Sequence, residues 1–267
     1  MAPKNKKGQA DAADESTSAP TLRVILPGDQ LPPHEANLPT GQDEDAVSMM
    51  IDQRAPPTIK LGPGLTPMDD DTIISVKAGV LNHTDIGNRW WVESNQRRYV
   101  AAPGESVIGI VTGKTGEHYK MDIGTAQPAL LPVLAFENAT KKNRPNFNIG
   151  DLLYCRVAMA NKDMEAELDC VNPTTGKSDG FGELKGGFAF KVSLGLARRL
   201  LDPRQAVVLR ELGKHFPFET AVGMNGKVWI NSASTAHTIL IANAIKNSEF
   251  LSTAQCQSMV KKMVERI

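Results

Sequence analysis

The sequence predicts a multidomain protein, mainly β with an α+β domain at its C-terminal end. Its 267 residues exceed the usual size of one domain, so two or three modules of about 70 to 100 residues are expected. Short β-branched runs separated by proline and glycine occupy residues 21–172, which is the pattern of β-rich units. After residue 187 the apolar residues also recur at helical spacing, which indicates a mixed domain over residues 188–267.

The composition is that of an ordinary globular protein without a strong overall charge. Hydrophobic residues make up 41% of the chain, so each module can bury a core. Thirty Lys and Arg balance thirty Asp and Glu, so any contact with nucleic acid must come from a local basic patch. Cys155, Cys170 and Cys256 have no metal-binding spacing, which favours reduced, buried thiols in a cytosolic or nuclear protein.

The N-terminal residues predict neither secretion nor membrane insertion. They lack an apolar signal core, and no apolar run in the chain reaches about 18 residues. Residues 1–20 are small, polar and charged, so we expect a disordered tail. Its Lys4, Lys6 and Lys7 fit either a nuclear-import signal or plain solvated charge.

Residues 21–100 predict a β-rich N-terminal domain. Its strand-like runs read RVILPGDQL, TIKLGPGL, TIISVKAGVL and RWWVESNQRRYV. Between the first two runs lies a proline-rich, acidic stretch, Pro32 to Pro57, which we interpret as a long loop or insertion without an assigned role.

Residues 101–172 predict a five-stranded OB barrel. The strand candidates are ESVIGIVTGK, HYKMDIGT, PALLPVLA, DLLYCRVAMA and MEAELDCV, with a long link, residues 136–150, between the third and the fourth. In this fold the face of strands two and three binds oligonucleotides, together with two loops. Those loops are predicted at Thr112–Glu117 and Asn161–Asp163.

A linker rich in Gly, Ser and Thr, residues 173–187, precedes a predicted KH domain at 188–267. The expected order is strand, helix, helix, strand, strand, helix, followed by a last helix. An RNA-clamping KH domain has a GxxG loop between its first two helices, where this chain reads LLDPRQ. Its GMNG turn lies between two strands instead, so we predict packing and positive φ, not RNA contact, for Gly223, Asn225 and Gly226.

Three cations stand close together in the link between the third and fourth barrel strands. Lys141, Lys142 and Arg144 are flanked by asparagine and proline, so exposed side chains that attract phosphate are expected. Taken by itself, such a run is more often an ordinary solvated surface. Arg98 and its neighbour Arg97 form a second basic pair near the start of the barrel, which fits RNA contact and structural salt bridges equally well.

Further RNA-binding candidates lie on the predicted oligonucleotide face. Lys114 falls in the first loop, and Tyr119 and Lys120 fall on the second strand beside His118. An aromatic ring next to cations suits base stacking combined with backbone contact. Strand alternation, however, turns either Tyr119 or its two neighbours into the core, so these residues cannot all serve.

Enzymatic patterns are weak throughout the sequence. Gly113-Lys114-Thr115 is similar to the end of a phosphate-binding loop, but that motif needs glycine where Ile108 stands. Asp69 to Asp71 fit a solvated turn better than a metal site. The histidines stand singly, without a partner at ligand or triad spacing. We therefore predict a protein that is not an enzyme, with no catalytic residue, metal, cofactor or small-molecule substrate.

Several stretches resemble one family of RNA-processing proteins. The matching stretches are LPGD (26–29), LGPGL (61–65), AGVL (78–81), RYV (98–100), VIGIV (107–111), LAFENATKKNRPN (134–146), IGDLLY (149–154), ANKDMEAEL (160–168), GFG (180–182) and GMNGKVWI (223–230). Together with the module order, they resemble the cap subunits of the eukaryotic RNA exosome. LGPGL and KKNRP favour the ribosomal RNA-processing protein 40 (exosome component 3) family over the related cap protein that also joins an S1-type barrel to a KH domain.

The resemblance implies a non-catalytic subunit in rRNA processing and RNA degradation. Its expected partners are RNase PH-like ring subunits, other exosome cap subunits and single-stranded RNA, with no membrane. The OB barrel would be of the S1 type and face the central pore, and the basic link Lys141 to Arg144 would face the RNA path. The implied location is the nucleus and nucleolus, and also the cytoplasm.

Two other functions remain open from the residues alone. A free-standing RNA-binding factor in ribosome maturation or translation could use the same modules outside any ring. A nuclease is the second alternative, and it requires a metal or general-base cluster that the sequence does not supply.

Overall fold

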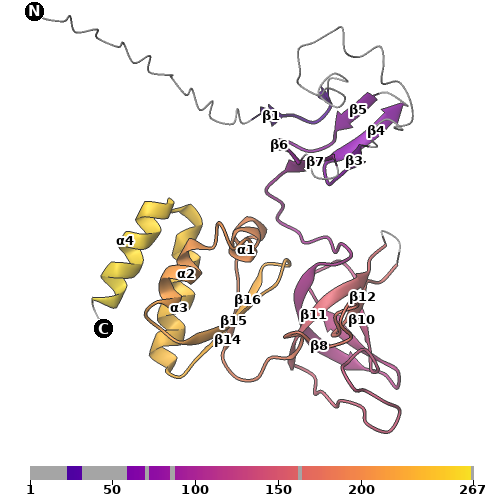
Figure 1. Cartoon of the computed structure of the whole chain (residues 1–267). Helices are drawn as coiled ribbons and strands as arrows, with labels where there is room; N and C mark the ends of the chain where they lie inside the picture. Colours follow the sequence, from indigo (N-terminus) through magenta and orange to yellow (C-terminus); the bar gives the residue numbers. More distant parts are fainter. Residues whose placement is uncertain (1–22, 32–58, 70–71, 85–87, 162–163, 266–267) are drawn as a thin grey trace, which may run out of the picture. The chain divides into compact units, whose positions relative to one another are not determined.

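The computed structural model describes residues 23–31, 59–69, 72–84, 88–161 and 164–265 (Figure 1). These fall into two compact units, Met1–Asn95 and Gln96–Ile267. The predicted tail at residues 1–20 and the stretch Pro32–Pro57 lie outside the described residues.

The described part of the first unit consists of short strands, as the sequence predicts. The strands are β1 Arg23–Ile25, β2 Gln30–Leu31, β3 Lys60–Leu61, β4 Leu65–Asp69, β5 Thr72–Ser75, β6 Gly79–Thr84 and β7 Arg89–Glu93. They form one sheet in the order β1-β6-β7-β3 and another in the order β2-β5-β4. The buried core contains Ile25, Leu65, Trp90 and Val92.

Two runs that read as single strands are each divided by a turn. In RVILPGDQL the chain turns at Gly28, which has φ +93°, and the Asp29 carboxylate accepts a 2.7 Å hydrogen bond from the Leu26 amide. In TIISVKAGVL the Ser75 hydroxyl donates to the Lys77 carbonyl oxygen at 2.7 Å, and the next strand starts at Gly79. A Cβ at Gly79 would lie 2.2 Å from the Glu93 carbonyl oxygen, so this close strand pairing requires glycine.

The second unit begins with the predicted five-stranded barrel. Its strands are β8 Ser106–Lys114, β9 His118–Asp122, β10 Ala129–Pro132, β11 Leu152–Met159 and β12 Glu167–Asp169. The sheet order is β12-β10-β9-β8-β11, and pairing of β12 with β11 closes the barrel. Alternate residues of β11 point inward, so Leu153, Cys155 and Val157 are fully buried.

The segment predicted as a linker contains a further strand. β13, Gly182–Glu183, pairs with Leu153 and Tyr154, in the part of β11 that precedes its pairing with β12. Before it, residues 172–179 form a hydrogen-bonded turn, in which Asp179 accepts from Asn172 at 2.7 Å and from Thr175 at 2.8 Å. The segment is therefore attached to the barrel over part of its length.

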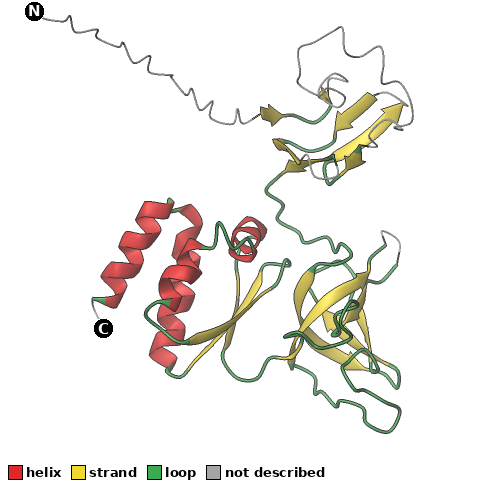
Figure 2. Ribbon diagram, viewed as in Figure 1, coloured by secondary structure: helices red, strands yellow, loops and turns green. Residues whose placement is uncertain are grey.

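The C-terminal domain has the predicted KH order. Its elements are β14 Phe188–Lys191, α1 Leu194–Leu201, α2 Val207–Gly213, β15 Phe218–Val222, β16 Lys227–Ser232 and α3 Thr235–Asn247, followed by a 3-10 turn at Ser248–Phe250 and by α4 Thr253–Val264. The sheet order is β14-β16-β15, and the helices lie on one of its faces (Figure 2). Side-chain oxygens of Ser193 and Ser252 cap α1 and α4.

Both faces of the C-terminal sheet are covered. Val228 and Ile230 of β16 pack on the helices, whereas Trp229 between them packs with Ala221 against Ile108 of the barrel strand β8. The barrel and the KH domain therefore share an apolar contact within one compact unit. None of the helices in the described ranges is long and apolar enough to cross a membrane.

Candidate nucleic-acid interface

The link between β10 and β11 folds back over the turn between β8 and β9. Arg144 ties the two segments together, because its Nη1 donates to the Gly116 carbonyl oxygen at 3.3 Å. The Arg144 Nε donates to the Lys141 carbonyl oxygen at 3.2 Å, which holds the link in a compact turn. The Lys114 ammonium group hydrogen-bonds to the Asn146 amide oxygen. Segments that lie about 30 residues apart in the sequence thus form one surface.

Buried aromatic side chains anchor this surface to the barrel. The Tyr119 hydroxyl donates a 2.5 Å hydrogen bond to the Pro145 carbonyl oxygen, directly beside Arg144. The Tyr119 ring meets the buried Phe147 edge-on, with the ring centroids 5.4 Å apart. Phe136 packs on Phe147 from the start of the link, at 5.2 Å. Apolar packing therefore fixes both ends of a segment whose charged residues face water.

The surface has a strong local positive charge in a neutral protein. Residues 112–120 and 140–146 together contain five Lys and Arg but one carboxylate, Glu117. Lys120, Lys141, Lys142 and Arg144 all have exposed side chains. A guanidinium group has five N–H donors and an ammonium group has three. Arg144 uses two in the bonds above and Lys114 uses one, so both keep donors for an anion.

The structure corrects two of the predicted positions. Lys114 is not in the first loop, because β8 continues to Lys114 past a bulge between Val111 and Gly113. Tyr119 is fully buried, and Lys114 lies over its ring at 5.6 Å from the centroid. Its ring is therefore inaccessible to a base, and the prediction of stacking on Tyr119 was wrong. Barrel closure places Tyr119 inside and leaves Lys120 on the exposed face of β9.

Arg98 lies at a distance from the basic link. Its neighbour Tyr99 is buried and donates to the Glu105 carboxylate at 2.6 Å, just before the first residue of β8. Burial and the Glu105 carboxylate raise the Tyr99 pKa well above its ordinary value. Lys114 is at the opposite end of the same nine-residue strand. The seven candidate residues therefore do not form one patch, and the structure brings together those of the link and of the β8–β9 turn.

The GMNG turn lies against the barrel. The Asn225 Nδ2 donates to the carbonyl oxygens of Ile108 and Ile123, at 2.8 Å each, and its Oδ1 accepts from the Ile108 amide at 3.3 Å. The Met224 amide donates to the Ser106 carbonyl oxygen at 2.8 Å. The turn thus occupies its polar groups in contacts with the barrel.

The two glycines of this turn have different reasons to be glycine. Gly226 has φ +73°, and a Cβ there would lie 2.6 Å from the Val192 carbonyl oxygen. Gly223 has no positive φ, but a Cβ would lie 2.8 Å from the Ile108 amide nitrogen. Positive φ and close approach to Val192 of the KH domain therefore explain Gly226, while close approach to the barrel explains Gly223.

Two residues of this contact were not singled out in the sequence. The buried Lys227 donates to the Asp122 carbonyl oxygen at 2.9 Å, with the Asp122 carboxylate 3.7 Å away. Burial lowers the Lys227 pKa, and the Asp122 carboxylate partly opposes that shift. The Trp229 Nε1 donates to the Gly186 carbonyl oxygen at 2.8 Å. The sequence contained one indication of this contact. Three successive apolar or small residues, Val107 to Gly109, break the alternation expected of a strand with one solvent-exposed face.

The side chains that could ligate a metal ion are scattered over the described residues. Among the residues that the structure describes, no group of three or more His, Cys, Asp or Glu could hold a metal ion. Of the acidic trio, Asp70 and Asp71 lie outside the described residues. The arrangement can bind anions through its exposed cations.

The fold and the site define a chain of S1-type barrel and KH modules preceded by a small β-domain. Family profiles match all three parts: Exosome complex exonuclease Rrp40 N-terminal domain over residues 59–98, Exosome complex component RRP40, S1 domain, over 99–182, and KH domain over 187–236. The human Exosome complex component RRP40 is 36% identical over 274 residues, which cover 98% of each chain. The chain belongs to the exosome complex component RRP40 family.

Other relatives agree with this membership. The Drosophila melanogaster protein of that name is 47% identical over 71% of this chain and 80% of its own length. The Schizosaccharomyces pombe protein is 44% identical over 77% of this chain and 88% of its own length. A crystal structure provisionally assigned as an exosome complex RNA-binding protein matches with a TM-score of 0.51 at 16% identity, over 63% of this chain and 98% of that one. This last match shows a shared fold.

Proposed function

We propose that the chain is a non-catalytic RNA-binding cap subunit of the RNA exosome. Family membership supports the assembly, because the relatives are named as components of that complex. In this proposal the chain stabilises a ring of RNase PH-like subunits, contacts other cap subunits, and guides single-stranded RNA toward the pore for 3'-to-5' processing and decay. It works in the nucleus and nucleolus, and also in the cytoplasm.

The observation that carries the RNA role is the basic surface of the link. Lys141, Lys142 and Arg144 project from a turn whose ends are fixed by buried aromatic side chains, and Lys114 lies beside them. Cations in fixed positions can hold phosphates without ordering a flexible loop for each contact. With Tyr119 buried, the surface offers phosphate contacts and no stacking ring from that strand. Binding should therefore be nearly independent of RNA sequence.

The junction of barrel and KH domain supports the ring-stabilising role. Asn225 and Lys227 connect the two domains through partly buried hydrogen bonds, beside the apolar contact around Trp229. Contacts made by one domain with a ring subunit would therefore also orient the other domain. The basic link is part of the barrel, so this coupling would hold it in a fixed position.

A salt titration of RNA binding on the reconstituted complex tests the RNA role. The variant replaces Lys141, Lys142 and Arg144 with alanine. Each phosphate contact with single strands contributes about 0.7 to the slope of log K against log salt, so the slope should fall in magnitude by about 2. Folding should be unaffected, because exposed substitutions change stability by about 0.5 kcal/mol or less.

A matched control removes three exposed cations of the KH domain, Arg204, Arg210 and Lys261. It changes the net charge equally and should leave the slope unchanged if the link makes specific phosphate contacts. Equal slopes for the two triple variants, with unchanged degradation of a long single-stranded substrate, would contradict the RNA role of the link. Size-exclusion chromatography of the endogenous protein distinguishes an exosome subunit from a free-standing RNA-binding factor, since a ring component elutes with a very large assembly.

A further inference from the structure

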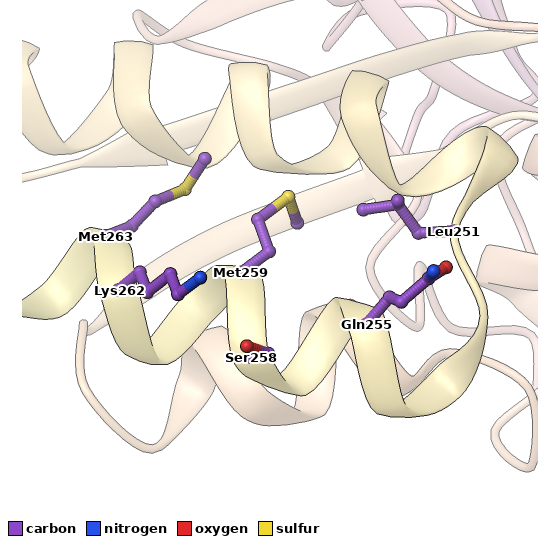
Figure 3. Close-up of a pocket in the computed structure, with 6 residues that line it drawn as sticks. All are labelled: Leu251, Gln255, Ser258, Met259, Lys262 and Met263. Atoms are coloured by element: carbon purple, nitrogen blue, oxygen red, sulfur yellow. The ribbon is translucent and has the colours of Figure 1, made fainter.

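Helix α4 leaves an apolar hollow beside α3 at the end of the KH domain. The hollow has a volume of about 490 Å³ and is lined by Leu251, Gln255, Ser258, Met259, Lys262 and Met263. Figure 3 shows Met259 and Met263 projecting from α4 toward the neighbouring helix, with Lys262 at the rim. These methionines are half-buried, so their side chains pack on the domain and still reach solvent.

A second hollow continues this surface along α3. It has a volume of about 440 Å³ and is lined by Ala236, Ile239, Leu240 and Asn243 together with Met263. Met263 belongs to both hollows, so they form one surface, which we call the α3–α4 groove. Ile239 is 61% exposed, and an isoleucine in this groove gains free energy when a partner covers it.

The lining of the two hollows contains one cation, Lys262, and no carboxylate. α3 and α4 carry Lys246, Lys261 and Lys262, and the nearest glutamates, Glu249 and Glu265, lie just outside the two helices. All three lysines are exposed, and Lys262 lines the groove. A ligand with a carboxylate at the edge of an apolar stripe would complement this lining, because the carboxylate would meet Lys262 with no acidic residue in the lining to oppose it.

We infer that the α3–α4 groove binds an acidic amphipathic helix of a partner protein. A groove between two helices accepts a third helix, whose apolar residues at i, i+3 or i+4, and i+7 fill successive hollows. Methionine side chains are flexible and polarisable, so Met259 and Met263 can adapt to the anchors. The partner helix presents Asp or Glu on the side that faces Lys262.

Other occupants fit the groove less well. RNA binding relies on a track of cations with aromatic rings, whereas the lining of these two hollows contains one lysine and no aromatic ring. A second copy of this chain would bring together two linings that each contain Lys262 and no carboxylate, so neither lining would offer Lys262 a partner. The groove is part of the KH domain, and this inference does not depend on the RNA contacts of the basic link.

Site-specific photocrosslinking tests the inference in the intact cellular protein. The photoreactive residue replaces Ser258 in one variant and Asn243 in another, since these exposed residues line the two hollows. A control places it at Gln257, which is exposed on α4 but does not line the groove. We expect both groove positions to capture the same segment of one protein, a helix with apolar anchors and acidic flanks, and Gln257 not to capture it.

The captured segment then serves as a synthetic peptide in a binding titration with the purified chain. Lys262→Glu should weaken peptide binding by about tenfold or more, because the carboxylate of the peptide would then face a second carboxylate in place of the lysine. A Glu→Lys change in the peptide should restore the affinity for this variant. Ser258→Trp should block binding, whereas Gln257→Trp should not. The inference would be overturned if the two groove positions captured no shared segment, or if they captured RNA or a second copy of the chain. It would also be overturned if the peptide bound Lys262→Glu and the parent with equal affinity.

Discussion

Replacing Asn225 with alanine should separate the barrel from the KH domain. The side chain makes three hydrogen bonds to the barrel, two donated to carbonyl oxygens at 2.8 Å and one accepted from an amide at 3.3 Å. Each bond contributes about 1 kcal/mol net, so the loss should be about 3 kcal/mol. For a unit of this size, Tm should fall by about 6–12 °C, since 1 kcal/mol corresponds to about 2–4 °C.

A closer variant distinguishes hydrogen bonding from shape. Asn225→Asp keeps the side-chain volume but turns the two donated bonds into contacts between a carboxylate and the carbonyl oxygens of Ile108 and Ile123. It should therefore be at least as destabilising as alanine. If shape alone mattered, the aspartate variant would melt like the parent.

Differential scanning calorimetry is a direct assay, because it records the unfolding of both domains, whose contact contains the buried Trp229. Uncoupling should also divide one transition into two, as the domains then unfold separately. Asn243→Ala is the matched control, since that asparagine is exposed on α3 and should change stability by about 0.5 kcal/mol or less. A melt of Asn225→Ala within about 1 °C of the parent would refute the reasoning.

Three further predictions concern the glycine turn, the pH dependence of stability and catalysis. Gly226→Val should lower the free energy of unfolding in urea by about 1 to 3 kcal/mol, because φ is +73° and a Cβ meets the Val192 carbonyl oxygen. Gly116→Val is the control and should lower it much less, because Gly116 lies in open space without positive φ. Equal losses for the two variants would contradict this prediction. Because the Tyr99 pKa is raised in the folded state, the phenol ionises first in the unfolded chain, so unfolding free energy should fall as pH rises above about 10. Tyr99→Phe should reduce that fall in urea titrations; an identical pH profile would rule out Tyr99 as its source. The purified chain should not cleave labelled single-stranded RNA with Mg²⁺ or Mn²⁺, and co-purifying, metal-dependent cleavage that is lost on replacing Asp69 to Asp71 would refute the non-catalytic assignment.

Periodicity along the chain was enough to predict the order of the elements in the second unit. Each of the five barrel strands and each KH element appears where the alternating and helical patterns indicated. Local signals succeed here because burial of one strand face or one helix stripe repeats every two or 3.6 residues, and Gly, Pro and Asn-Gly mark the turns between. Very short elements could not be predicted in this way. The strand β13 was assigned to a linker, because two residues are too few to show a periodic pattern.

The candidate site shows where such reasoning stops. Alternation divides His118, Tyr119 and Lys120 between two faces but does not say which face is inside. Barrel closure decided it, with Tyr119 bonded to the Pro145 carbonyl oxygen and Lys120 exposed. The cations of the link could be recognised as a group, but their contact with Gly116 depends on the path of the folded chain.

The sequence by itself determined the module order, the neutral overall charge with its local basic run, and a GMNG turn in the wrong place for an RNA clamp. Only the tertiary structure decided what that turn does, since Asn225 meets Ile108 across 117 positions of sequence. Hydrogen-bond donors and acceptors carry no label for a distant partner, whereas hydrophobic period and turn chemistry act between near neighbours. Pairing over long separations is therefore settled by packing of the whole unit, and it is this packing that joins the barrel to the KH domain.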